Sequence, residues 1–306
     1  MSHLNKALSN MGFLVNKQTL KFNNLSLSEL GFGASPLGQV YGPVSSKDAQ
    51  YLVSRAIDQG INYFDVAPYY GNAESILGAC LPKNKSKLVL STKVGRYGPK
   101  TFDFSKKRLQ SSIESSLKQL KTDYLDIIFC HDIEFANPKE LLEEAIPFLE
   151  TYQKKGVIGA IGASAYLLKP LLNIAKHPSI SIILSYANYC LINTQLIAVM
   201  DEFNASSIDV INASPLAMGL LSQKGPAKWH PSKDTHTRIL ELSKTQHLEG
   251  ESLNFALDQN DFASTLVGFS NITELDFALH CYKNGSKQNY NETFKALKPL
   301  RPLFWN

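Results

Sequence analysis

The amino-acid sequence predicts an α/β fold in which eight parallel strands, each followed by a helix, close into a (β/α)8 TIM barrel. Short runs rich in Ile, Leu, Val and Phe alternate with longer segments of helical periodicity along the 306 residues. Hydrophobic residues make up 44% of the chain, and no Pro-, Gly- or Ser-rich linker divides it. We therefore expect a single domain over residues 19–306 after an N-terminal extension, residues 1–18.

Eight β-rich runs are the candidate strands, and eight is the number needed to close a barrel of this kind. Six of them lack polar alternation, as do strands buried on both faces, whereas the first and fifth are rich in glycine. The runs cover residues 29–34, 61–65, 87–93, 125–131, 159–164, 180–186, 208–214 and 264–270.

A hairpin is expected ahead of the first run, because residues 19–22 and 26–30 flank Asn23 and Asn24. Asn tolerates positive φ, so these two strands can turn tightly and close the floor of the barrel.

Several of the predicted helices carry recognisable end signals. Ser46 and Ser105 are predicted N-caps, and Asn137 with Pro138 forms a cap and first-turn pair. Pro147 lies inside the helix that Asn137 begins, so we expect a kink there.

An alternating chain can also wind into an open Rossmann sheet, which carries the motif GxGxxG at its first turn. Residues 31–36, GFGASP, contain the first two glycines of that motif, but Pro36 stands in place of the third. The barrel is therefore preferred.

The composition argues against several classes of protein. The 31 Lys and Arg residues against 27 Asp and Glu form no long basic run, so nucleic acid is not an expected partner. No apolar stretch approaches the ~18 residues that a membrane span needs. The first ten residues lack the apolar core of a secretory signal, so we expect a cytoplasmic enzyme.

Four widely spaced cysteines without a CxxC pair indicate reduced core residues and neither disulfides nor a metal site: Cys80, Cys130, Cys190 and Cys281.

Polar residues end several of the predicted strands. Asp65 ends the second run, Lys93 the third and His131 the fourth, while Tyr70 follows Asp65 in the next loop. Serines end the fifth, seventh and eighth runs: Ser164, Ser214 and Ser270. Because the carboxyl ends of barrel strands converge on one mouth, we expect these side chains to meet there.

Four of these groups suit proton transfer coupled to hydride transfer. A free tyrosine has a pKa of about 10, too high for an effective base near neutrality. An ammonium such as Lys93 favours the phenolate, a carboxylate anchors the ammonium, and an imidazole can orient the substrate oxygen. Taken singly, the Asp could be a helix cap, the Tyr a rim aromatic, the Lys solvated and the His structural. Jointly, their place at the ends of three successive strands indicates catalysis.

Three segments around these residues resemble the aldo-keto reductases: residues 64–71 (FDVAPYYG), 91–96 (STKVGR) and 127–135 (IIFCHDIEF). The resemblance implies a (β/α)8 barrel with Asp65, Tyr70, Lys93 and His131 as catalytic residues. It also implies a nicotinamide dinucleotide bound without a Rossmann motif. Cofactor contacts are implied at Ser164, Ser185, Ser214, Leu216, Gly268, Ser270 and Glu274.

Residues 30–44, 95–109 and 213–231 resemble a subgroup of this family that oxidises the anomeric carbon of an aldose to a lactone with NAD, and L-galactose is the favoured substrate. The chain departs from the general family pattern at Ala165, Ser185 and Ala213, where Asn, Gln and Tyr are common. Phe277 and Ala278 replace an acidic residue and an Asn that often contact adenine.

Glu274 bears on the choice of cofactor, because NADP-dependent relatives place Arg there to hold the 2′-phosphate. A carboxylate would repel that phosphate and can accept hydrogen bonds from ribose hydroxyls, so NAD is predicted. The plainer interpretation of Glu274 is a residue of the first helical turn favoured by the helix dipole.

Three alternatives remain open at this stage. The chain could oxidise another aldose, such as L-fucose or D-arabinose; it could be an NADPH-dependent carbonyl reductase; or it could be a non-catalytic subunit that senses nucleotide on the same fold. A small-molecule sugar is the expected partner, and the sequence does not indicate an oligomeric state.

Overall fold

The computed structural model describes residues 14–23, 25–39, 41–285 and 289–298. Most of the predicted N-terminal extension, residues 1–13, lies outside the described residues, as does Asn24 of the predicted hairpin turn.

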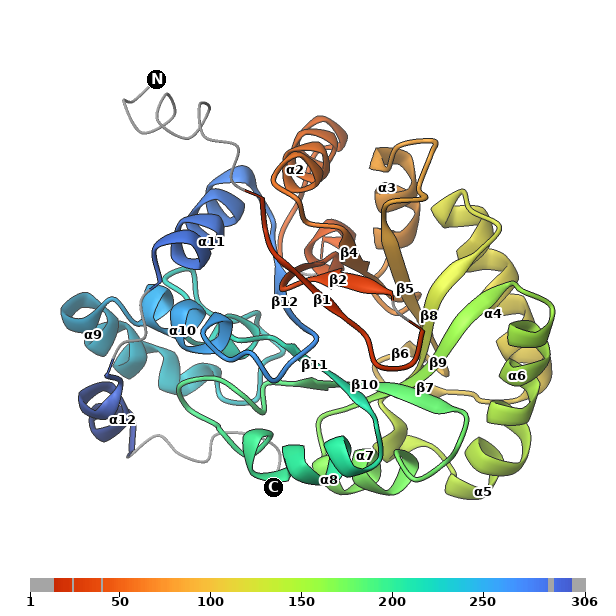
Figure 1. Cartoon of the computed structure of the whole chain (residues 1–306). Helices are drawn as coiled ribbons and strands as arrows, with labels where there is room; N and C mark the ends of the chain where they lie inside the picture. Colours follow the sequence, from red (N-terminus) through yellow and green to blue (C-terminus); the bar gives the residue numbers. More distant parts are fainter. Residues whose placement is uncertain (1–13, 24, 40, 286–288, 299–306) are drawn as a thin grey trace.

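Eight parallel strands form a closed barrel, as the sequence predicts (Figure 1). Around the barrel the order is β3-β4-β5-β8-β9-β10-β11-β12, and β12 pairs back onto β3. Closure excludes the open Rossmann sheet. Each predicted run overlaps one strand: β3 (Leu30–Gly33), β4 (Tyr63–Asp65), β5 (Val89–Val94), β8 (Leu125–His131), β9 (Ile158–Ala165), β10 (Ile180–Tyr186), β11 (Asp209–Ala213) and β12 (Ser264–Gly268).

The glycines in β3 and β9 make room for large side chains inside the barrel. A Cβ on Gly31 would come within 2.7 Å of Leu266 and 3.0 Å of the Tyr63 ring. A Cβ on Gly162 would meet the Phe129 ring at 2.6 Å. These strands are therefore poor in β-branched residues for a packing reason.

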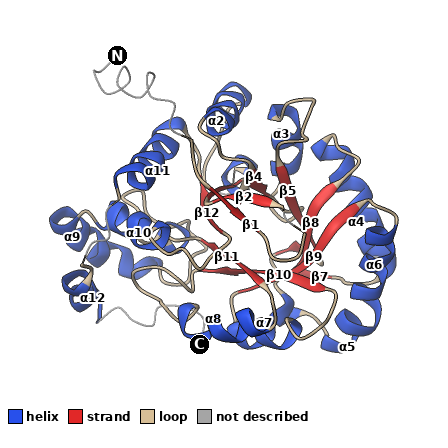
Figure 2. Ribbon diagram, in the orientation of Figure 1, coloured by secondary structure: helices blue, strands red, loops and turns tan. Residues whose placement is uncertain are grey.

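Helices surround the barrel on its outside (Figure 2). They follow the strands in the alternating order that the sequence predicts, with two helices after β8, β11 and β12. Their bounds are α2 (Ser46–Asp58), α3 (Ala73–Cys80), α4 (Lys106–Leu120), α5 (Pro138–Glu140), α6 (Ile146–Lys154), α7 (Leu168–Ile174), α8 (Met200–Ala205), α9 (His236–Gln246), α10 (Leu248–Leu257), α11 (Ile272–Asn284) and α12 (Asn291–Leu297).

The helix ends match the predicted caps in part. Asn137 caps α5 by accepting a 2.9 Å hydrogen bond from the Lys139 amide. The predicted cap Ser46 is wrong by one residue, because Ser45 Oγ accepts the hydrogen bond from the Asp48 amide at 3.1 Å. Ser105 stands at the N-cap of α4 but makes no capping hydrogen bond with its side chain.

Pro147 is accommodated by a π-helical turn, Leu141–Ala145, rather than by a simple kink in one α-helix. Proline has no amide hydrogen, and its ring collides with the carbonyl four residues earlier in an α-helix. The wider turn directly before α6 relieves both problems.

A two-stranded hairpin, β1 (Lys17–Thr19) with β2 (Ser26–Ser28), precedes the barrel. Its first strand starts two residues earlier than predicted. Leu20 and Leu27 are buried in the same apolar cluster as Tyr63 and Val89, inside the barrel. The hairpin therefore closes the amino end of the barrel, as expected.

Two apolar clusters form the core, one inside the barrel and one between the barrel and its helices. All four cysteines are buried with free thiols. Among the described residues, no three His, Cys, Asp or Glu side chains are grouped so that they could hold a metal ion. None of the described helices combines the length and apolar character that crossing a membrane requires.

β6 (Arg96–Gly98) and β7 (Thr101–Phe102) form a second small hairpin, which the sequence did not predict. It follows β5 directly and therefore stands at the carboxyl end of the barrel, beside the polar strand ends.

Candidate active site

The four predicted catalytic residues, here called the tetrad, come from the carboxyl ends of three neighbouring strands. Asp65 ends β4, Lys93 is the penultimate residue of β5, and His131 ends β8. β5 pairs with both β4 and β8, so the three ends are adjacent. Tyr70 lies in the loop between β4 and α3.

Asp65 and Lys93 form a buried ion pair, with side chains only 7% and 1% exposed. Lys93 Nζ donates to Asp65 Oδ2 and, at 2.9 Å, to the Val66 carbonyl oxygen. Asp65 Oδ1 accepts a 2.6 Å hydrogen bond from Ser91 Oγ. Because an unpaired buried charge is costly, these partners hold the ammonium in one position.

Tyr70 packs against both Lys93 and His131. Lys93 Nζ lies 5.2 Å from the centroid of the Tyr70 ring. The Tyr70 and His131 rings meet edge to face with their centroids 5.8 Å apart. Ammonium, phenol and imidazole therefore form one contact cluster at the barrel mouth.

Gly38, in the loop after β3, packs against the backbone of the Tyr70 loop. It ends a 3₁₀ helix, Ser35–Gly38, that follows β3. A Cβ on Gly38 would lie 1.7 Å from the Tyr70 carbonyl oxygen, a distance that no side chain can tolerate. The backbone of Tyr70 can take this position only because residue 38 is glycine.

The electrostatic surroundings of Tyr70 differ from the sequence-based expectation. Burial raises the pKa of the Tyr70 phenol well above 10, and the Asp65 and Asp132 carboxylates raise it further, whereas Arg96 lowers it. The Lys93 charge is matched by Asp65, and its ammonium lies over the ring. The expected depression of the Tyr70 pKa is thus outweighed by burial and the carboxylates, and the phenol is protonated at neutral pH.

His131 is neutral at physiological pH. Burial lowers the pKa of His131 to about 3, although Asp132 acts in the opposite direction. His131 Nε2 lies 3.7 Å from Asp132 Oδ1, and His131 Nδ1 has no hydrogen-bond partner among the described residues. A neutral imidazole carries one N–H, so it can donate to a substrate oxygen and orient it.

A cavity of about 140 Å³ opens at the same mouth, at the ends of β3, β11 and β12. Its wall includes five of the seven residues for which the resemblance implies a cofactor contact: Ser214, Leu216, Gly268, Ser270 and Glu274. Phe277 and Ala278 also line it.

The backbone of the loop after β11 is sharply bent where it lines this cavity. Ser214, Ala217 and Met218 have φ values of 58°, 50° and 54°, which non-glycine residues adopt at a cost. Such conformations gather at ligand-binding segments. The cavity and this bent loop fit part of a nicotinamide dinucleotide, whose remainder would extend along the open mouth.

Glu274 has two roles in the described structure. It caps α11 together with Asn271: the Ser270 amide donates to Glu274 Oε2 at 2.6 Å, and the Glu274 amide donates to Asn271 Oδ1 at 3.0 Å. The plainer interpretation, a first-turn helix residue, is therefore correct. Glu274 also lines the cavity together with a second carboxylate, Glu249, so the cavity wall carries two acidic groups.

Ser164 and Ser185 do not line the cavity. Both are buried, at the ends of β9 and β10, which lie between the tetrad strands and β11 in the barrel. Ser164 Oγ accepts from the Asp132 amide at 3.4 Å, and Ser185 Oγ accepts from Asn188 Nδ2 at 2.9 Å. Their hydroxyls thus organise the mouth between the two regions.

Three charged residues beside the tetrad had no predicted role. Arg96 Nη1 donates to Asp132 Oδ2, and the Arg96 guanidinium lies 4.0 Å from the Tyr69 ring centroid. Glu134 is the third; burial and Asp132 raise its pKa to about 7. The signal that could have found them is their position, immediately after the ends of β5 and β8.

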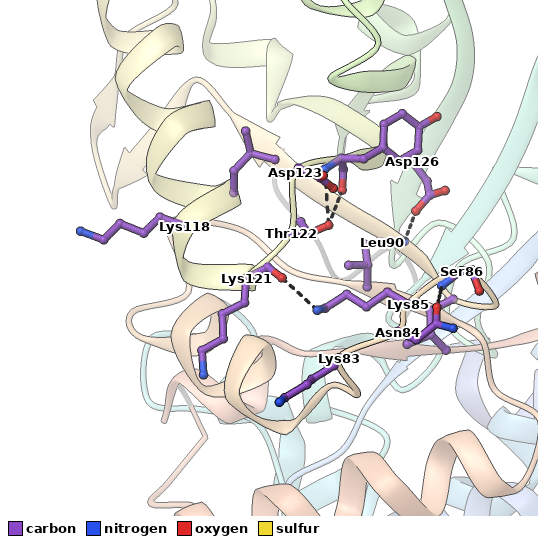
Figure 3. A pocket seen from close by; sticks show the side chains of 13 residues that line it. Lys83, Asn84, Lys85, Ser86, Leu90, Lys118, Lys121, Thr122, Asp123 and Asp126 are labelled. Atoms are coloured by element: carbon purple, nitrogen blue, oxygen red, sulfur yellow. Dashed lines mark hydrogen bonds between the residues drawn. The ribbon is translucent and has the colours of Figure 1, made fainter.

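A larger cleft of about 790 Å³ lies at the opposite end of the barrel, beside the loops that lead into β5 and β8 (Figure 3). Four lysines line it: Lys83, Lys85, Lys118 and Lys121. Lys85 Nζ donates to the Lys121 carbonyl oxygen at 2.9 Å. This cleft contains no tetrad residue and is separate from the candidate active site.

Comparison with known proteins identifies the chain's relatives. Residues 29–297 match the model of the Aldo/keto reductase family. The chain is 34% identical to L-galactose dehydrogenase of Arabidopsis thaliana over 92% of this chain and 94% of that protein. It is 29% identical to D-arabinose 1-dehydrogenase of Saccharomyces cerevisiae, over 88% and 87%. A solved aldo-keto reductase from Bacillus halodurans shares the fold, with a TM-score of 0.76, 23% identity and coverage of 94% and 96%.

Proposed function

Because the chain belongs to the aldo/keto reductase family, we propose that it is an NAD-dependent sugar dehydrogenase. It oxidises the anomeric carbon of an aldose to the lactone, and L-galactose is the proposed substrate. The sugar class is supported by the relatives named for L-galactose and D-arabinose, since the chain spans most of the length of both.

One observation carries the proposed chemistry: the Tyr70 ring contacts both the Lys93 ammonium, at 5.2 Å, and the His131 ring, at 5.8 Å. A hydroxyl placed between the phenol and the imidazole can lose its proton to one while the other orients its oxygen. The ion pair with Asp65 holds the Lys93 ammonium in place beside the phenol throughout.

The proposed reaction places the C1 hydroxyl of a cyclic aldose between Tyr70 and His131. The ionised Tyr70 oxygen takes the hydroxyl proton, and the neutral His131 donates its N–H to the same substrate oxygen. A nicotinamide dinucleotide, when bound at this mouth, would supply the acceptor for the C1 hydride and a positive charge that favours the phenolate. Loss of this proton and hydride converts the C1 alcohol to a carbonyl.

The acidic wall of the cavity supports NAD over NADP. Glu274 already accepts the Ser270 amide at the start of α11, a site where a phosphate would otherwise find N–H donors. Glu249 adds a second negative charge to the wall. A 2′-phosphate would be repelled there, whereas ribose hydroxyls can donate to these carboxylates.

Initial rates across a panel of aldoses, each with NAD and NADP, test the proposal. We expect turnover with L-galactose and NAD, weaker turnover with L-fucose or D-arabinose, and a preference for NAD. Turnover of simple aldehydes with NADPH, without any aldose oxidation, would contradict it.

A carbonyl reductase is the second candidate, and one observation favours it. The raised pKa of Tyr70 keeps the phenol protonated, which suits a proton donor to a carbonyl oxygen. The same panel, run in the reducing direction, compares the two candidates directly.

A further inference from the structure

Five side chains at or just after the carboxyl ends of β4, β5, β8 and β10 take no part in the proposed proton transfer. This mouth cluster consists of Tyr69, Arg96, Asp132, Glu134 and Tyr186. Tyr69 and Asp132 contact His131, with ring centroids 6.2 Å apart for Tyr69 and a 3.7 Å distance from Nε2 to Asp132 Oδ1. Arg96 contacts both Tyr69 and Asp132. Tyr186 ends β10, and its ring centroid lies 5.9 Å from that of Tyr166, whose amide donates to Glu134.

Each carboxylate in the mouth cluster is held by one oxygen and leaves the other unpartnered. Asp132 Oδ2 accepts from Arg96, and Glu134 Oε1 accepts from the Tyr166 amide at 2.8 Å. Asp132 Oδ1 and Glu134 Oε2 are buried and have no hydrogen-bond partner among the described residues. Buried acceptors without partners are costly, so they point to a donor supplied by a ligand.

Arg96 retains donors of its own. Within the described residues it donates only to Asp132 and, through Nε at 3.4 Å, to the Gly98 carbonyl oxygen. A guanidinium has five N–H groups, so most of them stay free. The side chain is 19% exposed, which leaves it open to a ligand at the mouth.

The charges and rings of the mouth cluster suit a neutral, hydroxyl-rich ligand. The cluster contains one guanidinium and two carboxyl groups, so it has no excess positive charge with which to bind a phosphate or carboxylate. Tyr69 and Tyr186 are partly exposed aromatic rings, against which the C–H face of a sugar ring can pack.

We propose that the mouth cluster binds the ring hydroxyls of a neutral aldose, with Asp132 and Glu134 as acceptors and Arg96 as a donor, and that it selects against sugars carrying a phosphate or carboxylate. This inference rests on the proposed sugar dehydrogenase function and assigns the substrate class to named side chains. His131 adjoins Asp132 in the chain, so hydroxyls bound here would lie next to the reacting C1 hydroxyl.

The inference is tested by asking whether Glu134→Gln changes the loss of kcat/KM that follows removal of one hydroxyl from the substrate. The full chain is assayed with its best aldose, with each monodeoxy derivative of that sugar, and with the corresponding 6-phosphate. For the wild-type protein we expect one deoxy derivative and the phosphate to lose about tenfold in kcat/KM, the scale of a hydrogen bond to a charged group. In Glu134→Gln the same deoxy derivative should lose much less kcat/KM relative to the parent sugar, and the difference should appear mainly in KM. The preference for the parent sugar over its 6-phosphate should also become smaller.

Asp126→Asn is the matched control, because Asp126 lies on the same strand as His131 but near the amino end, beside the lysine cleft. It should leave the kcat/KM losses for the deoxy derivative and for the 6-phosphate as they are in wild type. Arg96→Lys provides a second variant that keeps the charge opposite Asp132, and it should weaken aldose binding while retaining turnover.

The outcomes separate the inference from the proposed function. If removing the hydroxyl or adding the phosphate lowers kcat/KM by the same factor in wild type and in Glu134→Gln, while aldose oxidation is intact, only the role of the mouth cluster is overturned. Absence of oxidation of any aldose by the wild-type protein would overturn the proposed function itself.

Discussion

The two sides of the barrel mouth are built on different principles. On the β4, β5 and β8 side, the chemistry depends on charged and aromatic side chains that are buried and matched to one another, such as Lys93 with Asp65. On the β11 and β12 side, an open cavity is formed by bent backbone, small residues and a helix start, with Glu274 at its edge. Under the proposed function, the first side carries out the proton transfer and the second selects the cofactor.

This contrast implies that the two sides can be disabled separately, because no tetrad residue lines the cavity. A substitution on one side should therefore leave the property set by the other side unchanged.

The largest effect is expected for Tyr70→Phe, which removes the phenol oxygen and keeps the ring. A general acid or base contributes 10²–10⁴-fold, so we expect kcat to fall by about 10³-fold. Dinucleotide affinity, measured by calorimetry, should stay near wild type because the cavity is unchanged. Turnover close to that of wild type would rule out Tyr70 as the proton-transfer residue.

Lys93→Met tests whether the tetrad side is a matched charge assembly. Removing the ammonium leaves the Asp65 carboxylate buried without its counter-charge, so the free energy of unfolding should fall by about 3 kcal/mol. Denaturant unfolding measures this change. The double variant Lys93→Met with Asp65→Asn should recover much of the stability, because no charge is then stranded. Failure of the double variant to recover would show that Asp65 does not depend on Lys93.

The pH dependence of sugar oxidation tests the raised pKa of Tyr70. The base form is scarce below that pKa, so kcat/KM for oxidation should rise about tenfold for each unit of pH from about 6 to about 10. His131 should not limit this range, because its pKa of about 3 keeps it neutral throughout. A plateau below about pH 8 would instead mean that Lys93 and the bound cofactor bring the pKa of Tyr70 down.

The smallest effect concerns the cofactor side. Glu274→Gln keeps the capping geometry and removes the negative charge, so the ratio of kcat/KM for NADP to that for NAD should rise about tenfold. The pH profile set by Tyr70 should not change. Leu142→Gln, at an exposed site on the π-helical turn, serves as a surface control with an unchanged cofactor ratio. A shift in the pH profile of Glu274→Gln would show that the cavity side influences the ionisation of Tyr70, so that the two sides are not independent.

Local patterns predicted much of the structure because they reflect local physics. Strands buried on both faces must be apolar, so their runs are visible in the sequence, and Asn137 followed by Pro138 can begin a helix wherever it lies. The errors arose where neighbours compete or distant atoms decide. Ser45 and Ser46 are equivalent as caps by residue type. The π-helical turn before Pro147 depends on how the widened helix packs.

The barrel, the position of Asp65, Lys93 and His131 at adjacent strand ends and the acidic Glu274 could be predicted from the chain alone, because apolar periodicity and strand-end position are local patterns. The charge state of Tyr70 depends on the folded arrangement, since burial and the Asp65 and Asp132 carboxylates act on it through space. The mouth cluster was not predicted, because the positions of Arg96, Asp132 and Glu134 after strand ends are visible in the sequence but the atoms left without partners are set by the folded contacts.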